Sequence, residues 1–299
     1  MHHYAHSGLS LTSQVELPEW DDFAADVAAG APDVTIALSD ERAPAFPADG
    51  STHVRGDTAG FCIAGVGCWK LERGRAITLY PGLAADPREL RLFTLGSAWG
   101  LLGYQRGHAM WHGSAIEIGG RAVLFCGDAG EGKSTMAAAM VATGAALVAD
   151  DLGRVEPGVG GAAIHPSSAR IKLWSAALDH FGWRERVIER DWMRGDKFHC
   201  GVPSHHGGGG PLPLAAVVVL ATGDRLALEP LKGGEALKAV LAGTIYRPEA
   251  LEAMGRWGEQ GALAMRVVAQ VPVMKLTRPR DLAALGRAAD LVCEELSRG

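Results

Sequence analysis

Gly127-Asp-Ala-Gly-Glu-Gly-Lys133-Ser134 is the stretch of this 299-residue sequence that decides the fold. It fits the pattern G-x-x-x-x-G-K-[ST], in which a glycine-rich loop joins a strand to a helix and surrounds a phosphate with backbone N–H groups. An apolar strand, Val123 to Phe125, precedes the loop, and the alanine-rich residues from Ser134 to Thr143 predict a helix after it. Glycines let the backbone curl around one anion, and the helix N-terminus adds about half a positive charge. These flanks predict a phosphate-binding loop.

Two side chains at the end of this loop have roles that follow from their chemistry. Lys133 would reach the β- and γ-phosphates of a nucleoside triphosphate, and the hydroxyl of Ser134 would hold Mg²⁺. The expected ligands are therefore ATP, or another nucleoside triphosphate, and Mg²⁺. The alternative is a glycine-rich turn that matches the pattern by chance.

An acidic pair, Asp150-Asp151, follows the apolar segment Ala145 to Ala149. That segment is expected to be a strand that ends at the pair, and a helix between two strands favours a parallel pairing of the two. Ligands of open parallel sheets lie beyond the carboxyl ends of the strands, so the pair is expected beside the γ-phosphate. One carboxylate would hold Mg²⁺ while the other accepts the proton of an attacking hydroxyl, in an order that the sequence leaves open. Otherwise the two aspartates only open a solvated turn.

Other polar residues are weaker candidates. His112 lies 127 − 112 = 15 residues before the loop, where an imidazole could orient an aspartate or the transferred phosphoryl group, or could be purely structural. Cations that would either stabilise phosphate charge or only keep the surface soluble are Arg170, Lys172 and Lys197. Residues with zinc-binding atoms but no regular spacing are His199, Cys200, His205 and His206. The tryptophans Trp69, Trp99, Trp111 and Trp174 are expected in the core.

Composition excludes several classes of protein. The chain is 47% hydrophobic, which excludes disorder, and its net charge is −5 without a basic tract, which argues against nucleic-acid or anionic-membrane partners. Five cysteines without a C-x-x-C pair favour reduced thiols. The N-terminus does not resemble a signal peptide, and the longest uncharged apolar run is too short for a membrane span. These features predict a cytoplasmic protein.

The chain is expected to have two domains. Residues 1–105 would form an N-terminal β-rich domain with a linking helix, and residues 106–299 an α/β domain with the loop. Asp86-Pro87-Arg88-Glu89 combines an N-cap acceptor, a proline at N1 and a glutamate at N3, which predicts that the linking helix starts there. Further expectations are a hairpin turn at 72–75, a charged helix at 184–194, strands at 215–220 and 271–276, and helices at 234–241 and 281–296.

The central stretch resembles the catalytic core of HPr kinase/phosphorylase. It runs from His112-Gly-Ser-Ala-Ile-Glu-Ile118 through Gly127–Thr135 to Leu147-Val-Ala-Asp-Asp151. That family carries a histidine before the loop, a G-[DE]-x-G-x-G-K-S loop and an aspartate pair after it, in this order and spacing. The resemblance is strongest over residues 108–155, and it extends over the whole chain to the HPr-kinase-related proteins through phrases such as Ala169–Trp174.

This resemblance implies an α/β fold: a P-loop kinase domain of the HPr kinase/PEP carboxykinase type with a smaller N-terminal β-rich domain. It implies Mg-ATP-dependent phosphorylation of a serine hydroxyl on a peptide or small protein, and the hexamers of the parent family imply a homo-oligomer. Some relatives of similar length phosphorylate the C-terminal serine of a precursor peptide in lasso-peptide biosynthesis, and this chain is compatible with that role. The glycine-rich residues 205–210 would then close over a flexible tail.

Carried over residue by residue, the resemblance assigns roles along the loop and the acidic pair. The implied catalytic residues are Asp150, Asp151, His112 and Lys133, and the implied Mg²⁺ ligands are Ser134 and Asp150. The implied nucleotide-binding residues are Gly127, Asp128, Ala129, Gly130, Glu131, Gly132, Lys133, Ser134 and Thr135. The later signature of the parent family, roughly E-x-R-G-L-G, is absent, which argues against action on HPr and against a phosphorylase activity.

Other function classes remain open at this point. A kinase of a small-molecule alcohol would also place an acidic group after the second strand, although such enzymes usually begin near their loop. A non-catalytic nucleotide sensor would need Lys133 but neither aspartate. A transport-type ATPase is disfavoured because its second signature is missing.

Overall fold

The computed structural model describes residues 1–27, 30–191, 193–205 and 210–297, and the chain has a mixed α/β fold that divides into two compact units. The first unit comprises Met1–Met110 and Tyr246–Ala262. The second comprises Trp111–Ile245 and the described chain from Leu263 onward. Residues 246–262 therefore cluster with the N-terminal part of the chain, although they follow most of the second unit in sequence.

The first unit is built on a β-sheet. Its strands are β1 (His2–His6), β2 (Leu9–Ser13), β3 (Val34–Leu38), β4 (His53–Arg55), β5 (Thr58–Ile63), β6 (Gly67–Glu72) and β7 (Ala76–Pro81). They lie in the order β1-β2-β3-β7-β6-β5-β4. The hairpin turn expected between β6 and β7 is confirmed: Arg73 and Gly74 adopt φ values of 53° and 63°.

The first unit also contains helices, from three separate parts of the chain. The helices of the unit are η1 (Pro18–Phe23), α1 (Pro87–Phe93), η2 (Thr94–Ala98), α2 (Trp99–Gln105), α6 (Pro248–Met254) and the beginning of α7 (Trp257–Val268). The predicted helix start is confirmed, because the Asp86 carboxylate accepts a hydrogen bond from the backbone N–H of Arg88 at 2.8 Å. No helix of the described ranges is long and apolar enough to cross a membrane.

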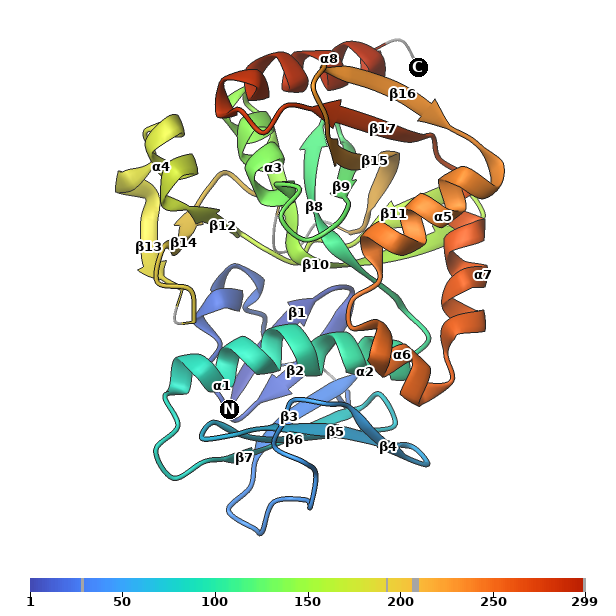
Figure 1. Ribbon diagram of the computed structural model, residues 1–299. Helices are drawn as coiled ribbons and strands as arrows, with labels where there is room; N and C mark the ends of the chain where they lie inside the picture. The colour runs from blue at the N-terminus through green and yellow to red at the C-terminus, as the bar shows by residue number, and fades with distance from the viewer. Residues whose placement is uncertain (28–29, 192, 206–209, 298–299) are drawn as a thin grey trace. The chain divides into compact units, whose positions relative to one another are not determined.

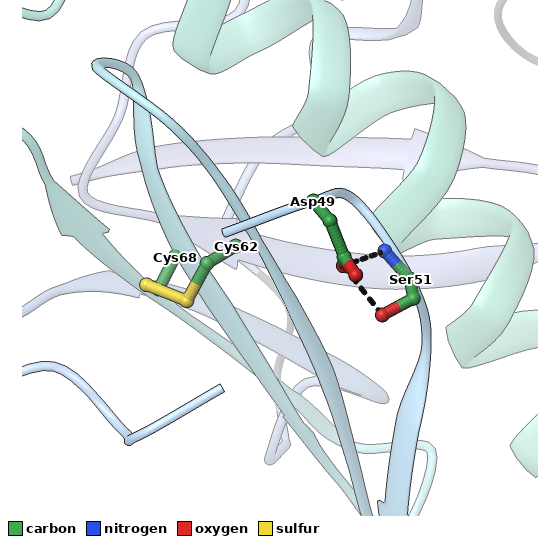
Figure 2. Close-up of a disulfide and its surroundings, with 4 residues drawn as sticks. All are labelled: Asp49, Ser51, Cys62 and Cys68. Carbon is green, nitrogen blue, oxygen red and sulfur yellow. Dashed lines mark hydrogen bonds between the residues drawn. A yellow bond between two sulfur atoms is a disulfide. The ribbon is translucent and has the colours of Figure 1, made fainter. Parts of the chain in front are cut away.

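Cys62 and Cys68 form a disulfide between β5 and β6 (Figure 2), so the expectation of reduced thiols is wrong for this pair. The two residues are direct partners in the hairpin register, with Cα atoms 4.1 Å apart. Opposed residues of antiparallel strands bring their side chains close, and sequence spacing alone does not reveal this pairing. Nearby, the backbone N–H and the hydroxyl of Ser51 both donate to Asp49, and the backbone N–H of Gly50 donates to the Cys62 carbonyl. Cys126, Cys200 and Cys293 are free thiols.

The second unit contains a larger sheet and a three-stranded one (Figure 1). The larger sheet consists of β8 (Ala109–Ile118), β9 (Arg121–Cys126), β10 (Ala146–Gly158), β11 (Gly161–Ile164), β15 (Leu212–Thr222), β16 (Ala227–Leu231) and β17 (Val273–Arg278). Its order is β11-β10-β8-β9-β15-β17-β16. The smaller sheet consists of β12 (Arg170–Trp174), β13 (Val187–Arg190) and β14 (Lys197–Gly201), with β14 in the middle.

Strands β9, β15 and β17 run parallel, so their carboxyl ends lie at one edge of the sheet. The expected direct pairing of the strand before the loop with the strand after the loop helix is wrong. β8 lies between β9 and β10 and is antiparallel to β9, and the parallel neighbour of β9 is β15. The chain returns to the sheet on the far side of β8, which places the acidic pair two strands from the loop strand.

The second unit also contains helices on both sides of this sheet and beside the smaller one. They are α3 (Lys133–Ala142), α4 (Ser175–Phe181), η3 (Arg184–Arg186), α5 (Gly233–Thr244), η4 (Leu282–Ala284) and α8 (Leu285–Ser297), with the end of α7. Val123 and Phe125 of β9 share one buried cluster with residues of α3 and α8. Successive strand residues face opposite sides, so Leu124 faces the other side, where α5 packs on β9 and β15.

The charged helix expected at 184–194 is wrong. Residues 184–186 form one 3-10 turn and Val187–Arg190 is strand β13, which pairs antiparallel with β14. Pairing with a neighbouring strand satisfies the backbone here, and it overrides the helical preference of the charged side chains. Residue 192 and residues 206–209, which include His206 and most of the glycine-rich 205–210 segment, lie outside the described residues.

Candidate active site

The loop joins β9 to α3, so the strand predicted before it and the helix predicted after it are confirmed. Gly127, Gly130 and Gly132 have φ values of 137°, 88° and 79°, in the left-handed region that only glycine adopts readily. A Cβ at Gly127 would also lie 2.8 Å from the Leu220 carbonyl oxygen. These glycines are therefore required by the curl of the backbone around the space in front of α3.

Lys133 is the first residue of α3, and its side chain is buried in the curl. Its Nζ donates to the carbonyl oxygens of Gly127 at 2.9 Å and Asp128 at 3.1 Å. Burial lowers the pKa of Lys133, although nearby Cys126 and the acidic residues oppose this effect. The ammonium is thus held at the loop by two neutral acceptors, which leaves its charge available to an anion.

The carboxylate of Asp150 contacts the loop directly. Its Oδ1 accepts from the hydroxyl of Ser114 at 2.6 Å and from the hydroxyl of Ser134 at 2.8 Å. Its Oδ2 accepts from the backbone N–H of Lys172 at 2.9 Å. The reading of the aspartates as a solvated turn is therefore wrong for Asp150, because this carboxylate is buried and bonded to three donors.

Asp151 is held by different groups. Lys172 Nζ donates to Oδ2 of Asp151 at 2.8 Å. The charge of this lysine is the main reason that the pKa of Asp151 lies far below its usual range. Burial opposes this effect, and His112 adds to it. Burial opposes the charge of Lys172, but the charge of Asp151 and the hydrogen bond to it outweigh burial and raise the pKa of Lys172. Both groups are therefore ionised at neutral pH.

The backbone at Asp151 is unusual. Its φ is 74°, a left-handed conformation that is uncommon for residues other than glycine and that gathers at functional sites. The expectation that a strand ends at the acidic pair is wrong, because β10 continues to Gly158. The left-handed residue breaks the alternation of side chains within a continuous strand, so that both carboxylates contact Lys172.

His112, on β8, supports this conformation. Its Nδ1 lies 2.7 Å from the carbonyl oxygen of Asp151 and 3.6 Å from the carboxylate. Because a carbonyl oxygen only accepts, Nδ1 carries the proton, and in the neutral ring Nε2 is then the acceptor nitrogen. Burial lowers the pKa of His112, although Asp151 opposes this effect.

The three predicted cations lie on the three-stranded sheet with different partners. Arg170 pairs with Glu189 at 3.5 Å, and Lys172 pairs with Asp151. Lys197 Nζ lies 5.9 Å from the centre of the Trp174 ring, and burial lowers its pKa against the opposing charges of the acidic pair. Trp174 is 49% exposed, so the expectation that it is a core residue is wrong.

The weak zinc candidates have other partners. His199 pairs with Glu189 and Asp191, and His205 pairs with Glu117. Within the described ranges no group of three or more histidine, cysteine or acidic side chains has the geometry to hold a metal ion. Mg²⁺ has different requirements, since one or two protein oxygens and a phosphate suffice. Ser134 and Asp150 supply two adjacent oxygens of the kind that Mg²⁺ prefers, so they fit that ion.

One residue near the loop was not predicted from the sequence. Arg278, the last residue of β17, donates from Nη2 to the Glu131 carbonyl at 2.9 Å. A Cβ at Gly132 would lie 2.5 Å from that nitrogen. The signal that could have identified Arg278 is a cation at the carboxyl end of a strand expected to run parallel to the loop strand.

No protein-family model matches this chain, and no curated protein sequence matches it. Among solved structures, the Hpr(Ser) kinase/phosphatase from Coxiella burnetii is similar over 63% of this chain and 97% of that chain. The sequence identity is 16% and the TM-score is 0.32. At these values the likeness assigns neither a family nor a reaction to this chain.

Proposed function

We propose that this chain is a kinase that transfers the γ-phosphoryl group of Mg-ATP to a serine hydroxyl of a peptide or small protein. One observation carries the proposal: the loop serine and the first aspartate are hydrogen bonded at 2.8 Å, so the loop and the acidic pair form one site. The class of the acceptor rests on the resemblance of the central stretch to HPr kinase/phosphorylase.

The loop would bind the phosphates through its backbone N–H groups and the N-terminus of α3. Lys133 would add a positive charge at the β- and γ-phosphates, and Ser134 with Asp150 would hold Mg²⁺. When bound, the ion neutralises charge that develops on the phosphate oxygens. The contacts of Asp150 with Ser114 and the Lys172 backbone fix its carboxylate in place for this role.

Asp151 would face the acceptor. Its low pKa keeps it ionised, so it would accept a hydrogen bond from the serine hydroxyl and hold the oxygen in line with the γ-phosphorus. As the oxygen–phosphorus bond forms, the bond from the γ-phosphorus to the bridging oxygen breaks and ADP leaves. The hydroxyl proton passes to Asp151. A weak base suits this step, because the proton is lost late in a loose transition state.

Cations around the aspartates would stabilise the transferred group. Lys172 is committed to Asp151 and Arg170 to Glu189. Among the described residues, Lys197 is the one of these three without a carboxylate within 4.0 Å. Lys197 is therefore the best placed to meet the phosphoryl oxygens as they gain charge. His112 would act on Asp151 by fixing its left-handed backbone.

The test is transfer of labelled phosphate. The protein is incubated with Mg²⁺, γ-labelled ATP and candidate serine peptides, including lasso-type precursors with a C-terminal serine, and mass spectrometry locates the phosphate. We expect phosphoserine on one peptide, and far less product in the same time with Asp151→Asn. Phosphate that appears on a small alcohol instead would replace the peptide by a metabolite as acceptor. ATP binding with no transfer to any acceptor, and no loss of cellular function in an Asp150→Asn, Asp151→Asn double variant, would contradict the kinase proposal.

A further inference from the structure

Arg278 is a buried charge that lacks an anion. Arg278 is only 7% exposed. Burial lowers the pKa of its guanidinium, although the charge of Glu131 opposes this effect. Nη1 and Nη2 donate to the carbonyl oxygens of Pro279 and Glu131, whereas Nε has no hydrogen-bond partner among the described residues. Buried arginines are almost always paired, because an unpaired charge or donor away from water is costly.

The carboxylate whose charge acts on Arg278, that of Glu131, is bonded to other groups. It accepts from the hydroxyl of Thr222 at 2.8 Å and pairs with Arg280 at 3.5 Å. Within the described residues, Arg278 has no ion pair at 4.0 Å or less. The protein therefore holds a guanidinium at the loop without supplying a counter-charge for it.

A glycine of the loop leaves room for this guanidinium. Gly132 is left-handed, and a Cβ there would lie 2.5 Å from Nη2 of Arg278, so any other residue would push the arginine away. The bond from Nη2 to the Glu131 carbonyl holds the guanidinium against the part of the loop that directly precedes Lys133. Arg278 is thus packed on the phosphate-binding segment itself.

Strand order indicates which part of a nucleotide would meet Arg278. The order β10-β8-β9-β15-β17 places Asp150 two strands to one side of the loop strand and Arg278 two strands to the other. The aspartates lie on the side where the phosphoryl group would be transferred. Arg278 lies on the opposite side, where the nucleoside end would be.

We propose that Arg278 binds a nucleoside-proximal phosphate of the nucleotide, the α- or β-phosphate, and thereby acquires the anion that it lacks. This inference rests on the nucleotide-binding part of the proposed function but not on the identity of the acceptor. The planar fork of arginine suits a phosphate, with Nε the donor that is still unused. Arg278 would then set affinity for the nucleotide, and the aspartates would set turnover.

Calorimetric titration with Mg-ATP and Mg-ADP tests this proposal, without any acceptor. Loss of one charge-assisted contact is expected to weaken binding about 10- to 100-fold. Arg278→Gln should weaken ATP and ADP by the same factor, and Arg278→Lys should weaken both by a smaller factor. Arg280→Gln is the matched control, because it removes an exposed charge beside the same loop and should change neither affinity more than about threefold.

Thermal unfolding without nucleotide separates binding from a structural role. Removal of an unpaired buried charge should leave the Tm of the free protein unchanged or raise it, whereas a structural arginine would give a lower Tm. Unchanged affinity in Arg278→Gln, or weaker ATP binding with unchanged ADP binding, would overturn the proposal. If the wild type binds no nucleotide, both this inference and the kinase proposal fall. If it binds nucleotide but transfers no phosphate, only the kinase proposal falls.

Discussion

The two flanks of the loop strand differ in whether their charged groups have partners of opposite charge or strong donors. On the acidic flank, Asp150 and Asp151 of β10, the carboxylates are already bonded to hydroxyls, a backbone N–H and Lys172. On the basic flank, formed by Arg278 at the end of β17, the buried arginine has only carbonyl partners. A flank with satisfied charges can be assembled before the ligand arrives, whereas a flank with an unsatisfied charge is completed by the ligand.

The largest expected effect is on the acidic flank. Asp151→Asn keeps the shape of the side chain, and asparagine tolerates the left-handed backbone. It removes the group that accepts the proton in the proposed reaction, so kcat should fall about 10²- to 10⁴-fold while ATP affinity is retained. Steady-state kinetics and calorimetry measure the two quantities. Asp290→Asn, on the exposed face of α8, is the control. Near-normal turnover in Asp151→Asn would contradict the assignment of turnover to the acidic flank.

Lys133→Met should have the next largest effect. The lysine lies between the flanks and would act on charge that develops between the β- and γ-phosphates, so kcat should fall about 10²- to 10³-fold. Lys238→Met removes an exposed lysine of α5 and should not change the rate. A variant of Lys133 that loses only affinity for ATP, with normal kcat at saturation, would place this lysine with the basic flank.

Gly132→Ala tests the close packing of Arg278 against Gly132 through its effect on the free energy of unfolding. A non-glycine residue in the left-handed region costs about 1–2 kcal/mol, and the added Cβ would also collide with Arg278. Urea unfolding should therefore show a loss of at least that size. In an Arg278→Gln background the loss should be smaller, since the collision is relieved, so the two changes should not be additive. Strict additivity would show that the arginine does not occupy that space in solution.

The smallest expected effect is the pH dependence of the acidic flank. The pKa of Asp151 in the folded protein lies below its unfolded value of about 3.9, so its pairing with Lys172 stabilises the fold above that value. The contribution is lost as the pH falls through the folded pKa. Solvent screens the pair because 44% of the Asp151 side chain is exposed, which limits the contribution to about 1 kcal/mol. Urea unfolding of wild type and Asp151→Asn should differ by this amount at pH 6 and converge in strong acid. A difference that persists unchanged at acid pH would contradict this assignment.

Local patterns predicted the local parts of the molecule. The glycine curl, the helix at Lys133 and the N-cap at Asp86 all depend on neighbours within a few residues, and the structure confirms them. Asp150 was expected near the loop on the premise that a strand ends at the acidic pair. It does contact Ser134 of the loop, although β10 continues past it.

Features that depend on strand pairing were not predictable from the sequence. The Cys62–Cys68 disulfide requires the register of β5 and β6, and strand β13 exists because β14 lies beside it. The partnership of Arg278 with Gly132 joins residues far apart in the chain, and only the strand order brings them together. The left-handed Asp151 has no local signal either, since it sits inside a continuous strand.

Lys172 connects the acidic flank to the three-stranded sheet. Its backbone N–H holds Asp150 and its side chain holds Asp151, so one residue of β12 serves both carboxylates. A displacement of β12 would move together the oxygens that we assign to Mg²⁺ and to the hydroxyl proton. In the proposed reaction, a molecule that binds to the three-stranded sheet would therefore affect both roles at once, and the exposed Trp174 ring at the end of β12 offers it a contact surface.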